Sequence, residues 1–101
     1  MNFRGPWEAM ETIEPGFNSD IIFQGKTYHV QTEDWGPERA CVITRVFLSG
    51  SVVSSLKTQY ESLEKQSPAT GRRAIQFGMR EQHQKVLDQL VSGTLLNTSL
   101  K

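Results

Sequence analysis

The stretch DIIFQGKTYHVQ, residues 20–31, carries the strongest structural signal in the chain. Apolar and polar side chains alternate on both sides of Gly25-Lys26, which predicts two half-buried strands joined by a two-residue hairpin loop. This loop pairs the apolar side chains on one face, Phe23 with Tyr28 and Ile21 with Val30. The other face carries the polar residues Gln24, Thr27, His29 and Gln31. The segment therefore predicts a hairpin with one buried face and one solvent-facing face.

A second hairpin is expected after Trp35-Gly36-Pro37, where glycine and proline interrupt the ladder. Residues 41–48 and 51–59 are strand-like and flank a turn, but loops of Ser49-Gly50 and of Gly50-Ser51 both fit and give different registers. Apolar side chains occur at both odd and even positions, and so on both faces of these strands: Val42, Ile43, Val46, Phe47, Val52, Val53 and Leu56. We expect these strands either to be covered on both faces, or to be covered by the domain on one face and by a partner on the other.

The apolar spacing becomes helical after Tyr60. Residues 61–66 predict one or two helical turns, and Ser67-Pro68 starts another segment. One stripe of that segment contains Ile75, Met79, Val86 and Leu90, and Gly93 is a typical helix stop. The fold class is therefore predicted as α+β, with a four-stranded antiparallel sheet of two consecutive hairpins and a long C-terminal helix packed on it.

A chain of 101 residues has room for one domain. We expect that domain to span residues 17–93, between an N-terminal extension, residues 1–16, and a frayed tail, residues 94–101. In the extension, one side of a short helix would collect Phe3, Trp7, Met10 and Ile13. Such a helix is marginal alone in water, so it is expected to dock on its own domain or in a groove of a partner.

Charge and composition narrow the function classes. Eleven basic and eleven acidic side chains balance, but residues 1–40 carry a net charge of −4 and residues 41–101 a net charge of +4. The balanced total argues against a nucleic-acid-binding or lipid-binding protein. The chain has no apolar run that is long enough to span a membrane and no signal-peptide layout, so a cytoplasmic protein without a membrane partner is expected.

Catalytic and metal sites have little support in the sequence. His29 with Glu33 suggests an acid–base pair, but alternation supplies only amides and hydroxyls around it, and a surface histidine is the simpler interpretation. Cys41 is a single thiol, and together with His29 and His83 it does not complete a four-ligand structural zinc site. We therefore expect no enzyme activity, no cofactor and no metal.

Residues suited to binding a protein partner are more numerous. Trp35, beside Gly36-Pro37, is expected either to cover one end of the core or to project as a binding anchor. His83 is expected to be hydrogen-bonded at the sheet edge or to contact a partner's carboxylate or phosphate. The predicted partner-binding residues are Trp7, Trp35, Phe47, Val53, Arg72, Arg80 and His83. The partner can also be a second copy, giving a homodimer.

A nucleic-acid-binding regulator is the alternative function. It would use the basic side of the C-terminal helix, which carries Arg72, Arg73, Arg80 and Lys85. The same helix also carries Glu81 and Asp88, which makes a solvated surface the simpler interpretation.

Four strings resemble a family of small bacterial proteins, the RomX-like polarity proteins: FNSDI (17–21), GKTYHVQTED (25–34), SLKTQY (55–60) and QHQKVLDQLVSG (82–93). The resemblance covers about residues 17–93 and implies two hairpins with a terminal helix. It also implies an adaptor that pairs with a response-regulator-like partner, RomR, and promotes nucleotide exchange on the Ras-like GTPase MglA. The chain departs from the family in its acidic, aromatic extension and at Trp35-Gly36-Pro37, where an Asp-Ser-Gly-like loop is expected.

Overall fold

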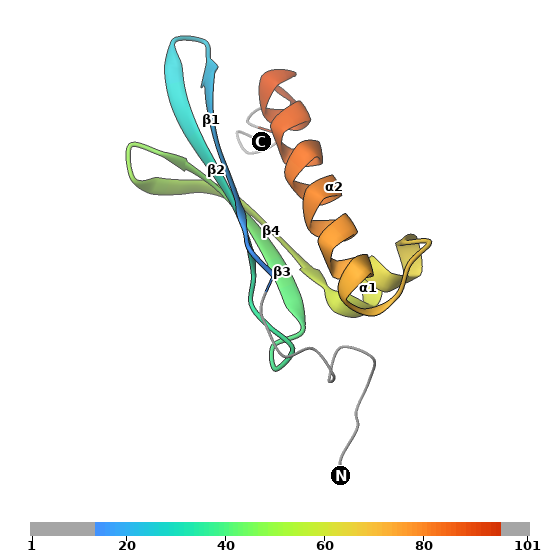
Figure 1. Cartoon of the computed structure of the whole chain (residues 1–101). Coiled ribbons are helices and arrows are strands. Elements are labelled where there is room, and N and C mark those ends of the chain that lie inside the picture. The colour runs from blue at the N-terminus through green and yellow to red at the C-terminus, as the bar shows by residue number, and fades with distance from the viewer. Residues whose placement is uncertain (1–13, 96–101) are drawn as a thin grey trace.

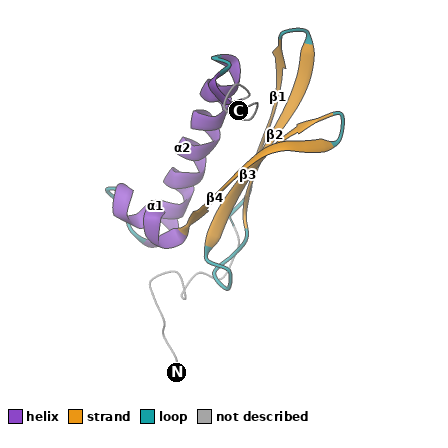
Figure 2. Ribbon diagram, turned by 180° about the vertical axis from the view of Figure 1, so that it is seen from behind, coloured by secondary structure: helices purple, strands orange, loops and turns teal. Residues whose placement is uncertain are grey.

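The computed structural model describes residues 14–95, which form one antiparallel sheet and two helices (Figure 1). The elements are β1 (Phe17–Phe23), β2 (Lys26–Asp34), β3 (Cys41–Leu48), β4 (Ser51–Gln59), α1 (Tyr60–Gln66) and α2 (Gly71–Val91). The strands pair in chain order, and α2 lies across one face of the sheet (Figure 2). The predicted α+β fold is confirmed. Trp7 and the apolar residues of its predicted helix lie outside the described residues.

The first hairpin turns at Gln24-Gly25, one residue earlier than predicted. Both residues have positive φ values, 52° and 78°, which is the geometry of a type I′ turn. Consequently Ile21 pairs with Tyr28 and Phe23 with Lys26. The predicted partners were therefore wrong. The predicted faces were right, because moving the turn by one residue shifts each partner by two positions and leaves side chains on the same face.

The second hairpin turns at Ser49-Gly50, which also has positive φ values, 53° and 82°. This resolves the two registers that the sequence left open. Phe47 pairs with Val52, but Val46 pairs with Ser54, so Val53 is an extra residue in a β-bulge. The bulge lets Val53 pack against the core on the side of α2.

The core lies between the sheet and α2 and consists of two apolar clusters. One contains Tyr28, Val30, Val46, Val86 and Leu90. The other contains Val42, Tyr60, Leu63, Ile75 and Met79. The four residues of the predicted helical stripe are all buried here. On the opposite face of the sheet, called the open face below, Ile43 and Phe47 are only half-buried among the described residues. The helix therefore covers the sheet from one side.

A buried carboxylate joins the end of β2 to the start of α1. Asp34 accepts hydrogen bonds from the backbone N–H groups of Gly36 and Glu14, both at 2.9 Å, and from the hydroxyl of Tyr60. Burial, and then the hydrogen bond to Asp34, raises the pKa of Tyr60, so this hydroxyl stays protonated. The Glu14 side chain is also buried and lies 3.1 Å from Arg72 of α2. These contacts fix where the chain enters the domain.

Candidate functional site

A chain of polar side chains crosses the core between the two apolar clusters. It runs over all four strands under α2: Ser19 (β1), His83 (α2), Thr32 (β2), Thr44 (β3), Gln82 (α2) and Thr58 (β4). Successive atoms lie 2.9, 2.8, 2.7, 2.9 and 2.6 Å apart. Buried polar groups need such partners, because an unpaired one loses the hydrogen bonds that water would supply. This buried polar chain therefore fixes how α2 sits on the sheet.

The direction of the chain's hydrogen bonds follows from one backbone carbonyl. The Leu56 oxygen can only accept, so the Gln82 atom 3.2 Å from it must be the amide nitrogen, which also donates to Thr44. Thr44 then donates its own hydroxyl proton to Thr32, the acceptor within reach. Thr32 in turn donates to Nδ1 of His83. With the opposite direction, the buried Thr44 hydroxyl would have no acceptor among the described residues.

His83 is therefore a neutral imidazole that carries its proton on Nε2 and donates it to Ser19. Burial, and secondarily the nearby His29, lowers the pKa of His83. The side chain is buried, and its ring lies 5.6 Å from the Phe17 ring, centre to centre, in a tilted arrangement. Both ring nitrogens are engaged inside the domain, so in this structure His83 offers neither of them to a partner.

The open face carries a second line of contacts that is accessible to solvent. An Arg45 Nη2 atom donates to Glu33 at 2.6 Å, and Nε1 of Trp35 donates to the same carboxylate oxygen at 3.3 Å. The Arg39 guanidinium lies over the Trp35 ring, 5.4 Å from its centre. Glu33 thus joins an aromatic residue of the β2–β3 loop to an arginine in the middle of the sheet.

The line continues across β3 toward the first hairpin. The Arg45 guanidinium lies 5.8 Å from the centre of the Phe47 ring, and the His29 ring lies 6.1 Å from the Phe47 ring. Nδ1 of His29 lies 2.9 Å from the Asp20 carboxylate on β1. We call this set the aromatic–arginine line: Arg39, Trp35, Glu33, Arg45, Phe47, His29 and Asp20.

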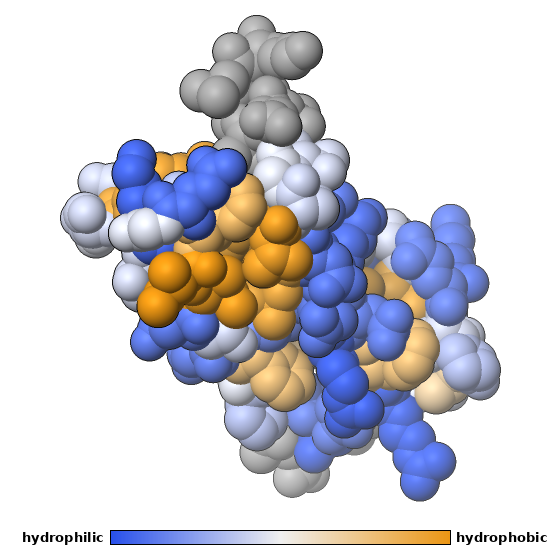
Figure 3. Space-filling model, turned by 90° about the horizontal axis from the view of Figure 1, so that it is seen from above, coloured by the Kyte–Doolittle hydropathy of each residue, from blue (hydrophilic) through white to orange (hydrophobic). Residues whose placement is uncertain are grey.

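The line lies in a surface that combines charge with exposed apolar area. At the hairpin ends, Ile22 and Val52 are 76% and 51% exposed. Seen from above (Figure 3), apolar side chains gather in a patch bordered by hydrophilic ones. Trp, Phe and Arg side chains that neighbours hold in place are typical anchors of protein interfaces, because little side-chain entropy is lost when they are covered.

The predicted partner-binding residues do not form one surface. Trp35 and Phe47 lie together on the open face, whereas Val53 faces the core and His83 is buried. Arg80 is exposed on α2. Arg72, on the same helix, is paired with Glu14 in a contact between the acidic and basic halves of the chain. Sequence reasoning missed Arg45, which needs the β2–β3 register to be recognised as the neighbour of Glu33.

The residues that the sequence suggested for catalysis or metal binding do not come together in one site. Asp20, and not Glu33, is the carboxylate at His29, and Cys41 is buried. Between residues 14 and 95, the structure contains no group of three or more His, Cys, Asp or Glu side chains that could hold a metal ion. In the same part of the chain, neither helix is long and apolar enough to cross a membrane.

Comparisons with protein-family models, curated proteins and solved structures find no match to this chain.

Proposed function

We propose that this protein is a non-enzymatic adaptor that binds a protein partner through the open face of its sheet. The observation that carries the proposal is the aromatic–arginine line, which crosses three strands on the face that α2 leaves uncovered. Trp35 and Phe47 serve as the anchors, and Arg39 and Arg45 hold their rings in place.

The chemistry of the line fits a protein surface better than a small ligand. Most of the line is spread over a sheet face, whereas small molecules are held in concave pockets that bury most of their surface. The end at Trp35 borders a cavity, which has a volume of about 400 Å³ and is widely open to solvent. Its Glu33–Arg45 ion pair is partly exposed, with 38% and 30% of the two side chains accessible, so a covering partner would exclude water from it. An interface of this kind has an apolar centre with charged groups that set the partner's orientation.

The family resemblance supplies the partners to test. It suggests that the protein works in the bacterial cytoplasm with the Ras-like GTPase MglA and the response-regulator-like protein RomR, in cell polarity or motility. Nucleic acid is a weaker candidate, because Arg72 is already paired with Glu14 and Lys85 is one turn of α2 from Glu81.

Titration calorimetry with the full chain tests the proposal. Purified MglA, loaded with GDP or with GTP, and purified RomR are each titrated with the wild type and with Phe47→Ser. We expect binding to at least one of them, and Phe47→Ser should weaken it about tenfold or more. Phe77→Ser is the matched control, because Phe77 is an exposed phenylalanine on α2 and away from the open face. If neither protein binds, or if the two variants behave alike, the proposal is wrong.

A further inference from the structure

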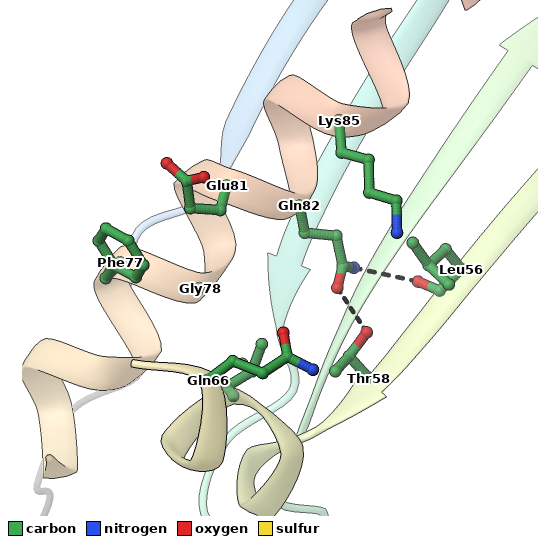
Figure 4. A pocket seen from close by; sticks show the side chains of 9 residues that line it. Leu56, Thr58, Gln66, Phe77, Gly78, Glu81, Gln82 and Lys85 are labelled. Atoms are coloured by element: carbon green, nitrogen blue, oxygen red, sulfur yellow. Dashed lines mark hydrogen bonds between the residues drawn. The ribbon is translucent and has the colours of Figure 1, made fainter. Parts of the chain in front are cut away.

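A groove lies beside the outer edge of β4, where the sheet meets both helices (Figure 4). Its volume is about 470 Å³, and its apolar lining includes Leu56 of β4, Leu63 of α1 and Phe77 of α2. Leu56 and Phe77 are 36% and 39% exposed, although both are large apolar residues. The groove is lined by residues of β4 and the two helices, and the open face contributes none.

The backbone of β4 faces this groove with hydrogen-bonding groups. β4 is an edge strand, so only its side toward β3 is paired. The Cys41 carbonyl accepts from the N–H of Trp35 on the β2 side of β3, so Val42 and Thr44, at alternate positions, point their backbone groups toward β4. Thr44 pairs with Leu56 and Val42 pairs with Thr58, so the backbone groups of Leu56 and Thr58 point toward β3. The N–H and C=O of one strand residue point the same way, and this direction repeats every two residues. The backbone groups of Ser55 and Lys57, the residues on either side of Leu56, therefore face outward at the free edge beside the groove.

Two long polar side chains complete the groove. Gln66 reaches from α1 toward Thr58, and Lys85 reaches from α2 toward β4 (Figure 4). Neither makes a hydrogen bond or ion pair with another residue of the described part of the chain. Gln66 thus offers an amide that complements a peptide group, and Lys85 offers a positive charge. Glu81 also lines the groove, but its carboxylate points away from β4, so Lys85 supplies the charge that faces the strand (Figure 4).

We propose that this groove binds an extended peptide segment of a protein partner, added as a strand to the free edge of β4. The outward backbone groups of β4 favour an extended segment over a helix, since a helix has already paired its own backbone groups. An apolar side chain of the segment packs between Leu56 and Phe77, and a nearby carboxylate pairs with Lys85. The segment is therefore apolar and acidic.

This site goes beyond the proposed function, because it is separate from the open face. A protein with two independent binding surfaces can hold two partners at once, which raises the effective concentration of one partner at the other. The two sites are tested by different variants, so either one can fail without the other.

The experiment selects random peptides displayed on phage against the immobilised full chain. We expect enrichment of peptides that carry an apolar residue close to Asp or Glu. A synthetic peptide of the selected sequence should shift the amide NMR signals of Ser55 and Lys57 and slow their hydrogen exchange. Lys85→Glu and Phe77→Ser should each weaken its binding about tenfold or more, and Phe47→Ser, on the open face, should not.

A charge exchange gives a second readout that a loss of folding cannot imitate. Replacing the acidic residue of the peptide with Lys should restore binding to Lys85→Glu and abolish binding to the wild type. The proposal is overturned if no peptide is enriched, if the peptide shifts amides of the open face instead, or if it binds as a helix. It is also overturned if the chain dimerises through β4, with the dimer lost in Phe77→Ser, because the occupant is then a second copy.

Discussion

Nδ1 of His83 lies 2.8 Å from the hydroxyl oxygen of Thr32 and accepts its proton. A proton added to Nδ1 would turn this acceptor into a donor. Thr32 and Thr44 would then have to reverse, and the buried Thr44 hydroxyl would lose its acceptor. The folded protein therefore favours the neutral imidazole, in agreement with the lowered pKa of His83.

We expect this relationship to make the protein less stable in mild acid. In the unfolded chain His83 titrates near its ordinary pKa of 6.5, whereas in the folded chain its pKa is lower. Below that ordinary pKa the unfolded state takes up a proton that the folded state does not. The free energy of unfolding therefore decreases as the pH is lowered. The slope from one such group is at most about 1.4 kcal/mol per pH unit, and the contribution of His83 is complete above the unfolded pKa.

Urea denaturation at a series of pH values on both sides of that pKa measures this slope. His83→Asn should be less stable than the wild type but should show a shallower dependence on pH. His29→Gln is the comparison, because it removes the smaller of the two causes of the lowered pKa of His83 and leaves burial, the larger one, so it should keep most of the wild-type slope. An unchanged slope in His83→Asn would show that other groups cause the acid sensitivity.

Thr44→Val tests the middle of the buried polar chain. The substitution keeps the shape of the side chain but removes the acceptor of Gln82 and the donor to Thr32. We expect a loss of about 1–3 kcal/mol in the free energy of unfolding, because a buried amide proton is left without a partner. Thr27→Val, at an exposed position of β2, should change stability by less than about 0.5 kcal/mol. Equal effects of the two substitutions would contradict this role.

Asp34→Asn tests the junction between β2 and α1. One of the carboxylate oxygens becomes an NH₂ group, which then faces an N–H or O–H donor. We expect a loss of about 1–3 kcal/mol in unfolding free energy, measured by urea denaturation. Asp20→Asn is the comparison, since its contact with His29 is exposed and should contribute less than about 1 kcal/mol. If Asp34→Asn changes the unfolding free energy as little as Asp20→Asn does, the hydrogen bonds that Asp34 accepts do not hold this junction in place.

Gln24→Asn should stabilise the protein. Gln24 has a φ of 52°, a left-handed conformation that asparagine tolerates better, and Asn-Gly is the preferred pair for this turn. We expect a gain of about 0.5–1 kcal/mol, seen as a higher melting temperature. Lys26→Asn places asparagine two residues further on, within β2, where it should give no gain. A gain at Lys26 and none at Gln24 would argue for the predicted Gly25-Lys26 loop.

The faces of the strands were predictable from the sequence, whereas the strand pairings were not. Alternation fixed that Ile21 and Tyr28 share the buried side, since a face depends only on parity. The position of the turn depends on which two residues adopt positive φ values. The alternation of apolar and polar residues is compatible with a turn at Gln24-Gly25 and with one at Gly25-Lys26. The bulge at Val53 follows from packing against the core, which local sequence does not encode.

The candidate site was predictable in part. Trp35 and Phe47 were singled out as isolated aromatic anchors, and the structure brings them onto one face. Their connection through Glu33 and Arg45 depends on the pairing of β2 with β3, which joins residues that are distant in sequence. The burial of His83 was not evident because its partners, Ser19 and Thr32, come from strands far from α2 in the chain.

The order of the strands has a consequence for how the chain is made. Each strand pairs with the one synthesised just before it, so the sheet can form as the chain leaves the ribosome. Val30, Val42 and Val46 stay uncovered during that time, because α2, which buries them, is made after all four strands. His83 and Gln82 arrive together on that helix, so the buried polar chain closes in one late step. A nascent chain that is released before residue 71 would expose an apolar sheet and is expected to aggregate.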